Sequence, residues 1–169
     1  MLRQLDAASR AAFPAATTAL LLLLLAAPLR VPGQAQVQPA VALACVFFWS
    51  LFRPASMPPP VVFALGLLSD LLGLEPPGVS VLTLLVTCGL AVRWRRVLTQ
   101  QGFLLVWLAF VAVAAGAAAL EWLLTSLLTF RLLPVSAALF QFGLTAGLYP
   151  MLATLFTRAH RSLANPEQA

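Results

Sequence analysis

The sequence contains no lysine and few charges of either sign. All ten basic residues are arginine, and charged residues make up 9% of the chain against 62% hydrophobic residues. Soluble domains are typically about 45–50% apolar and about 25% charged, so a water-soluble fold could not cover this much apolar surface. A lipid bilayer removes the need for a polar exterior. The composition therefore predicts an integral membrane protein.

Residue types that catalysis and metal binding usually require are also scarce. The chain has one histidine, His160, and two cysteines, Cys45 and Cys88, both inside apolar segments. Without lysine there is no P-loop, and a single histidine provides neither a Ser-His-Asp set nor a metal cluster. We expect no enzyme activity, no cofactor and no metal site, and we interpret the cysteines as small buried apolar side chains.

Apolar segments of helical length follow one another with short breaks between them. We expect six transmembrane helices, at about 13–29, 37–52, 61–74, 79–92, 103–124 and 132–156. The third and fourth are short, because a helix needs about 20 residues to cross the hydrocarbon. The expected architecture is an all-α polytopic membrane protein. Residues 1–157 would form one transmembrane domain, and residues 158–169 a polar cytoplasmic tail.

Arginine is distributed unevenly between the expected loops, and cytoplasmic loops normally carry the excess of basic residues. With six spans and a cytoplasmic N-terminus, eight arginines fall inside and two, Arg30 and Arg131, fall outside. The eight are Arg3, Arg10, Arg53, Arg93, Arg95, Arg96, Arg158 and Arg161. Merging the third and fourth spans would remove this bias. We therefore expect two crossings between residues 61 and 92, with both termini in the cytoplasm.

Proline and glycine mark two boundaries. Proline disfavours helical geometry in the residue before it, so Arg53-Pro54 is expected to end the second span at the cytoplasmic interface. There Arg53 could contact lipid headgroups or a cytoplasmic partner. Gly78 is expected to allow a tight start of the fourth helix that a Cβ atom would hinder.

Two acidic residues, Asp70 and Glu121, lie inside expected spans. Ionisable groups within a membrane are costly and are functional hypotheses by default. One interpretation is a proton or substrate relay. The alternative, which we favour, is that each carboxylate is hydrogen-bonded or paired within the bundle. Gly66, one turn before Asp70, would let a neighbouring helix of the same chain approach closely.

Small residues recur at helical spacing on the last two expected spans. Gly143 and Gly147 are four residues apart, as are Ala112 and Gly116. Such spacings allow helix backbones to pack closely in lipid. We expect these faces to pack within the chain in preference to packing against a partner.

The four tryptophans lie mostly toward the ends of expected spans. Aromatic side chains at such positions typically form belts at the membrane interfaces. We interpret Trp49, Trp94, Trp107 and Trp122 as interfacial anchors and not as a stacking site.

A stretch of about 40 residues resembles a known family. The aromatic-rich segment from Phe47 ends in Arg53-Pro54, and the segment after Pro60 contains Gly66-x-x-x-Asp70 and a turn with proline and Gly78. These features resemble the MreD family of rod shape-determining membrane proteins. The turn departs from the family, which commonly has a Gly-rich stretch and Pro-Leu-Gly where this chain has Leu-Glu-Pro-Pro-Gly.

The resemblance implies a component of the peptidoglycan elongation machinery in the bacterial inner membrane. Family members act with MreC, with the actin-like MreB, with a SEDS-type glycosyltransferase and with a class B penicillin-binding protein, and are not known as enzymes. Their fold is similar to the substrate-binding subunits of energy-coupling-factor vitamin transporters. An alternative function is therefore a transporter subunit, which would need a convergent polar pocket on the outer side. Its candidate residues are Asp70, Glu121, Arg131 and Gln141.

Overall fold

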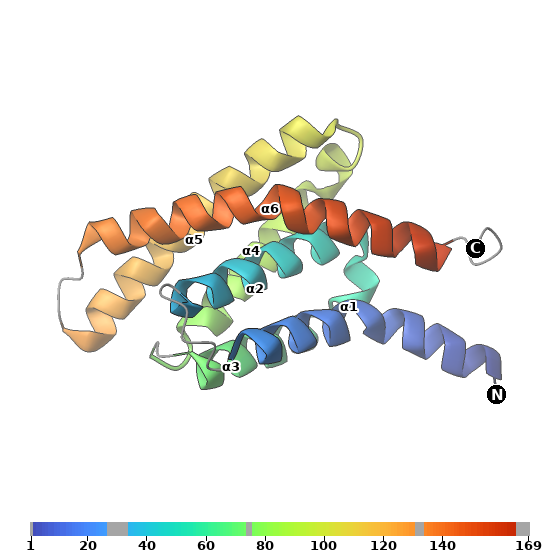
Figure 1. Cartoon of the computed structure of the whole chain (residues 1–169), viewed down its shortest axis with the longest axis horizontal. Helices are drawn as coiled ribbons and strands as arrows, with labels where there is room; N and C mark the ends of the chain where they lie inside the picture. Colours follow the sequence, from blue (N-terminus) through green and yellow to red (C-terminus); the bar gives the residue numbers. More distant parts are fainter. Residues whose placement is uncertain (1, 27–33, 74–75, 131–133, 165–169) are drawn as a thin grey trace.

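The computed structural model describes residues 2–26, 34–73, 76–130 and 134–164 (Figure 1). These residues form six α-helices and one 3-10 helix, with no strand among them. The elements are α1 (Leu2–Ala26), α2 (Gln34–Phe52), η1 (Pro54–Ser56), α3 (Pro59–Leu72), α4 (Val79–Leu98), α5 (Phe103–Thr129) and α6 (Val135–Ala164). The expectation of an all-α chain is confirmed for this part of the molecule.

The helices run alternately up and down the bundle. In Figure 1, α1 begins and α6 finishes at one end of the molecule, which we call the terminal end. At the opposite end, the loop end, α1, α3 and α5 finish and α2, α4 and α6 begin. Arg53 and η1 lie between α2 and α3, at the terminal end. The loop end therefore brings together the first turns of three helices.

Helix α2 lies at the centre of the bundle. Every residue from 40 to 51 is buried, and α2 contacts α1, α3, α4, α5 and α6. A helix that is apolar on all sides needs this kind of enclosure. The ring of Phe47 meets Phe110 edge to face at 5.1 Å between ring centroids, and Phe110 stacks on Tyr149 at 4.1 Å. These three rings join α2, α5 and α6.

Trp49 corrects one of the expectations for tryptophan. Its side chain is 1% exposed, and it packs against Phe13 at 6.2 Å and Phe156 at 5.4 Å between ring centroids. The interpretation of Trp49 as an interfacial anchor was therefore wrong, because its position near the end of α2 is covered by α1 and α6. Trp94 remains exposed on α4.

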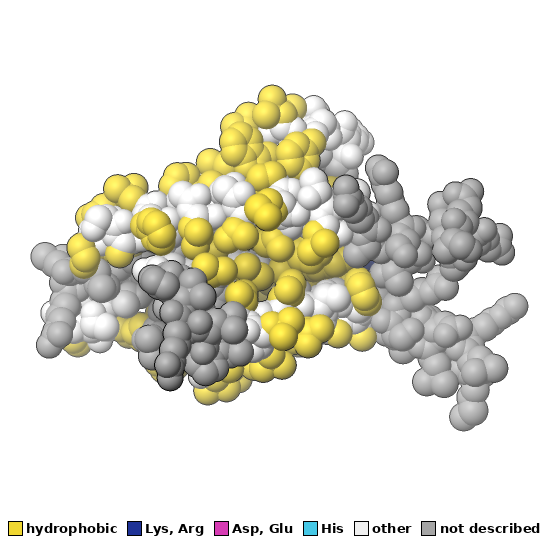
Figure 2. Space-filling model, in the orientation of Figure 1, with side chains coloured by type: hydrophobic (Ala, Val, Ile, Leu, Met, Phe, Trp, Pro, Cys, Tyr) yellow, Lys and Arg dark blue, Asp and Glu magenta, His cyan; other side chains and the backbone are white. Residues whose placement is uncertain are grey.

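The outer surface of the bundle is apolar on every helix. Large exposed hydrophobic side chains include Leu20 and Leu24 on α1, Phe52 on α2, Phe63 and Leu71 on α3, Val86 and Val97 on α4, Leu104 and Leu127 on α5, and Leu139 and Met151 on α6. Figure 2 shows hydrophobic side chains over much of the face seen in Figure 1. Contiguous apolar surface of this extent is typical of contact with lipid or protein.

Two helices of the described chain are long and apolar enough to cross a membrane. They are α5 and the part of α6 from Val135 to Thr157. Fewer than a third of the residues in their most apolar windows are buried, which is unlike the enclosed core helix of a soluble protein. A membrane location is consistent with these two helices.

Three helices continue beyond their expected last residues. Helix α4 runs through Arg93 and Arg96 to Leu98 instead of stopping at Val92. Arginine is a good helix former, and positive charge is favourable near the C-terminus of a helix. Helix α5 continues to Thr129, and the Thr129 hydroxyl donates to the carbonyl of residue 125 in its own helix at 2.6 Å. Helix α6 continues to Ala164, into the segment expected to be a polar tail.

Three helices begin earlier than expected, α1 at Leu2, α2 at Gln34 and α3 at Pro59. Hydropathy identifies the part of a helix that suits hydrocarbon, whereas the backbone hydrogen bonds of a helix can continue into polar surroundings. The last part of the expected first span, residues 27–29, lies outside the described residues. Helix α3 is as short as expected, with 14 residues.

Candidate functional site

Asp70 closes the turn between α3 and α4 at the loop end. The side chain is 7% exposed. One carboxylate oxygen accepts a hydrogen bond from the backbone N–H of Gly78 at 2.7 Å, and the other accepts from the N–H of Ser80 at 3.0 Å. The first N–H groups of a helix have no partner within that helix and carry partial positive charge. Asp70 therefore accepts hydrogen bonds from the otherwise unpaired N–H groups at the start of α4. This confirms the expectation of a partner within the same chain.

Gly66 lies one turn before Asp70, where α3 and α4 cross. A Cβ atom at Gly66 would lie 2.6 Å from the Cα atom of Val81, closer than real Cβ contacts come. The glycine is therefore required for the approach of the two backbones, as its position before Asp70 predicted. This approach places the Asp70 carboxylate against the first turn of α4.

Gly78 precedes α4 with φ +99°, a left-handed conformation. A Cβ atom there would meet no other atom within 4 Å. The requirement for glycine at this start of a helix comes from the backbone angle and not from crowding. Together, Gly66, Asp70 and Gly78 form one local arrangement that fixes α3 against α4.

Arg53 and Pro54 mark the end of α2, as expected. The backbone N–H of Arg53 donates to the carbonyl of Trp49 at 2.7 Å, and Pro54 opens the 3-10 helix that leads to α3. Arg53 is half-buried, at the terminal end of the bundle.

Glu121 on α5 is held differently from Asp70. Its side chain is 8% exposed, and one carboxylate oxygen accepts a hydrogen bond from the Gln141 side-chain amide on α6 at 2.6 Å. Asp70 bonds to the backbone of α4, and it does not line the cavity that Glu121 faces. The two carboxylates thus occupy separate surroundings, which disfavours the relay and agrees with the alternative.

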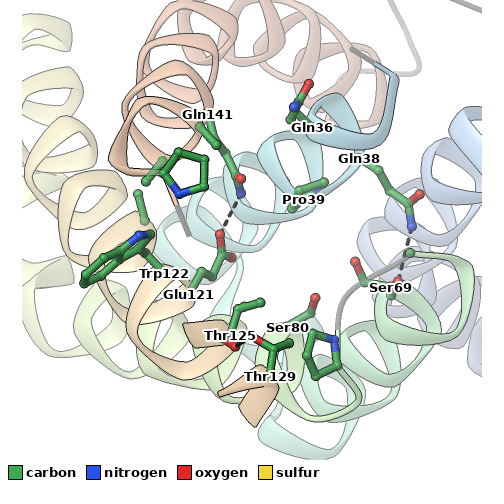
Figure 3. A pocket seen from close by; sticks show the side chains of 16 residues that line it. Gln36, Gln38, Pro39, Ser69, Ser80, Glu121, Trp122, Thr125, Thr129 and Gln141 are labelled. Carbon is green, nitrogen blue, oxygen red and sulfur yellow. Dashed lines mark hydrogen bonds between the residues drawn. The ribbon is translucent and has the colours of Figure 1, made fainter. Parts of the chain in front are cut away.

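Glu121 faces a cavity of about 580 Å³ at the loop end. We call it the loop-end cavity, and Figure 3 shows the side chains around it. Its polar lining residues are Gln36, Gln38, Ser69, Ser80, Glu121, Trp122, Thr125, Thr129 and Gln141. They come from five helices, α2 to α6. The Gln38 amide donates to the backbone carbonyl of Ser69 at 3.3 Å, which ties α2 to α3 at the cavity wall.

Sequence reasoning identified only part of this cavity. Glu121 and Gln141 were candidate residues for a polar pocket, and the structure brings them together. Asp70, a third candidate, does not line the cavity. Arg131, the fourth, lies outside the described residues. The glutamine, serine and threonine side chains were missed, because single uncharged polar residues near span ends carry little signal until the helices are assembled.

The glycine pair on α6 does not pack within the described chain. Gly143 and Gly147 are exposed, and a Cβ atom at either would meet nothing within 4 Å. The expectation of packing within the chain was therefore wrong for this pair, since their shared face points away from the bundle. Gly116 on α5 is similarly open, and with Ala112 it lines a groove of about 320 Å³ between α4 and α5.

Cys45 and Cys88 are buried and form no disulfide. Among the described residues, no group of three or more histidine, cysteine, aspartate or glutamate side chains could hold a metal ion. The side chain of His160 is not among those described.

No family model, no curated protein and no solved structure matches this chain. The resemblance to the MreD family therefore depends on the sequence features alone.

Proposed function

We propose that this chain is a non-enzymatic scaffold of the bacterial inner membrane and a component of the cell-elongation complex. In this role it would influence cell shape and lateral peptidoglycan synthesis by holding partner helices. The proposed partners are MreC first, then MreB, a SEDS glycosyltransferase and a class B penicillin-binding protein in the same assembly. The family resemblance around Arg53 and Asp70 supplies these names.

The observation that carries the scaffold proposal is the open small-residue face of α6. Gly143 and Gly147 allow close backbone approach, yet no atom of the described chain uses the space above them. Lipid gives no hydrophobic driving force for helix association, so small residues and close packing are what bring transmembrane helices together. A partner helix seated on this face would give the glycine pair a role that the bundle does not.

The proposal includes six membrane crossings with both termini in the cytoplasm. The up-and-down order of the helices and the apolar exterior of each support it. The arginine distribution supports the orientation. Reporter fusions test it: periplasmic signals are expected at Gln34, Glu75 and Arg131, and cytoplasmic signals at Met57, Gln100 and Pro166. A cytoplasmic signal at Glu75 would contradict the six-span topology.

The function is tested by affinity purification from membranes in a mild detergent. The intact protein should co-purify MreC and the wall-synthesis enzymes. Gly147→Leu should reduce MreC recovery while leaving the isolated protein folded, because the residue is exposed and a Cβ atom there meets nothing within 4 Å. Leu155→Ala, a change at another exposed position of α6, is the matched control and should retain MreC. Equal recovery of MreC by both variants would exclude this face.

A second candidate function is the substrate-binding subunit of a small-molecule transporter. The loop-end cavity favours it, because its volume of about 580 Å³ and its converging polar side chains are features of a binding pocket. On the proposed topology this cavity faces the outside. Co-purification of a transporter ATPase module in place of MreC would support this candidate over the scaffold.

A further inference from the structure

We propose that the loop-end cavity binds an uncharged, hydroxyl-rich molecule of the size of a mono- or disaccharide. The proposal concerns the cavity alone and goes beyond the scaffold function. It leaves open whether such a molecule is free in solution or carried on a lipid, and the experiment below separates the two.

The size of the cavity indicates a ligand. Protein interiors contain few voids larger than a water molecule, whereas ligand sites occupy about 300–1,000 Å³. At about 580 Å³, the loop-end cavity belongs to the second class. Thr129 and Pro134 on its lining are exposed, so the cavity opens at the loop end of the bundle.

The lining favours hydroxyl groups. The side-chain amides of Gln36 and Gln141 and the hydroxyls of Ser80 and Thr125 face a common space from four helices. Each of these groups combines donor and acceptor capacity, as does every hydroxyl of a sugar. Four such groups in one cavity are notable in a chain that is 62% hydrophobic. The Gln141 amide already donates to Glu121. A purely apolar ligand would offer no hydrogen bond to the donor and acceptor capacity that remains on these groups, at a cost in free energy.

Neither sign of charge suits the cavity. Among the described lining residues the only ionisable side chain is Glu121, and its carboxylate would repel an anion. The first turns of α2 and α6 contribute Gln36 and Ala137 to the same lining, whereas the start of α4 at Ser80 is already bonded to the Asp70 carboxylate. Helix starts carry partial positive charge, which opposes a cation. The two contributions counter each other, so an uncharged ligand fits best.

Trp122 completes the site. It lines the cavity one residue after Glu121, and Figure 3 shows its indole at the edge of the group of polar side chains, where it supplies apolar surface at the rim of the cavity. Ligand sites combine aromatic walls with a few placed polar groups. The C–H face of a sugar ring fits such a wall while its hydroxyls reach the amides.

The experiment uses the full chain in phospholipid nanodiscs, so that no glycosidic detergent competes. Tryptophan fluorescence and the thermal unfolding midpoint are measured with three probes of one ring shape: glucose, protonated glucosamine and glucuronate. Glucose is expected to bind saturably and about tenfold more tightly than either charged analogue. Tighter binding of glucosamine or glucuronate overturns the uncharged class. Maltose is measured as a fourth probe, of disaccharide size, and absence of saturable binding by both glucose and maltose overturns the site.

Variants locate the binding. Thr125→Val keeps the shape of the side chain and should weaken glucose binding about three- to tenfold, the equivalent of one hydrogen bond. Ala138→Phe fills the cavity and should abolish it. Thr154→Val, on the exposed side of α6, is the matched control and should bind normally. Unchanged binding by Thr125→Val and Ala138→Phe would contradict the assignment to this cavity.

A final comparison identifies the source of the ligand. Nanodiscs containing a glucosyl diacylglycerol should compete with free glucose if the cavity takes a lipid headgroup. Lack of competition, with free glucose still bound, supports a soluble sugar. Both outcomes are independent of MreC recovery, so this proposal and the scaffold function fail or succeed separately.

Discussion

The two buried carboxylates show how differently the two sides of this bundle are built. Asp70 has both oxygens bonded to the backbone start of α4, beside the close crossing at Gly66. Glu121 bonds to a side chain, Gln141, and faces a cavity. An acidic residue in an apolar helix can therefore close a turn between two helices or form part of the wall of a cavity. The hydrogen-bond partners of the carboxylate distinguish these two situations, whereas the exposed fractions of Asp70 and Glu121 are nearly equal.

The largest effect is expected at Asp70. Asp70→Leu leaves the N–H groups of Gly78 and Ser80 without acceptors and should lower the free energy of unfolding by on the order of 3 kcal/mol. Asp70→Asn keeps one acceptor oxygen and should lose about half as much. Thermal unfolding in detergent measures both, with the exposed Leu71→Ala as control. If Asp70→Leu had the thermal unfolding midpoint of the wild type, Asp70 would not stabilise the fold and would not differ from Glu121 in this respect.

Substitution of Gly66 should have the second-largest effect on the free energy of unfolding. Gly66→Ala places a methyl group against the backbone of Val81, which cannot rotate away, and should destabilise the protein by about 1–3 kcal/mol. Gly89→Ala on α4 is the matched control, because a Cβ atom there meets nothing within 4 Å. If the two variants unfold at the same temperature, the close crossing of α3 and α4 is not required.

Gly78 should have a smaller effect of a different origin. Gly78→Val places a β-branched residue at φ +99°, at an expected cost of about 1–2 kcal/mol. Gly78→Asn should cost less, because asparagine tolerates positive φ. The ratio of folded to aggregated protein after membrane extraction reports the difference. Equal yields for valine and asparagine would indicate that the backbone angle is not the constraint.

Glu121 should have the smallest effect on stability. Glu121→Gln keeps an oxygen that can accept from Gln141 and should change the free energy of unfolding by less than about 1 kcal/mol. Thermal unfolding measured beside Asp70→Asn gives the direct contrast. A loss at Glu121 as large as that at Asp70 would mean that both carboxylates serve the fold.

The turn between α3 and α4 could be predicted from sequence because its determinants are close together. Gly66, Asp70 and Gly78 lie within thirteen residues of one another, so helical spacing and the cost of a charge in lipid were enough to predict an intrachain partner. The end of α2 could be predicted for the same reason, since Arg53 and Pro54 are adjacent in the sequence. The last residues of α4 and α5 were not predicted correctly, because hydropathy marks the limit of the hydrocarbon and not the last hydrogen bond of a helix.

The loop-end cavity and the face of α6 could not be predicted in the same way. Gln36, Ser80 and Thr125 lie on three helices and are neighbours only after assembly. Likewise, the four-residue spacing of Gly143 and Gly147 shows that they share a face but does not give the direction of that face. Such directions depend on how the whole bundle packs around α2.

The length of α3 has a consequence for the surrounding lipid. Its 14 residues span about 21 Å, whereas the 27 residues of α5 span about 40 Å and the hydrocarbon about 30 Å. Phe63 and Leu71 expose the short helix on the outside of the bundle, so its neighbours do not hide the mismatch. In the six-span topology proposed above, lipids beside α3 would have to thin locally and α5 would have to tilt or emerge, each at a modest cost per ångström. The protein would then sit in the bilayer as a wedge, with its thin edge at α3.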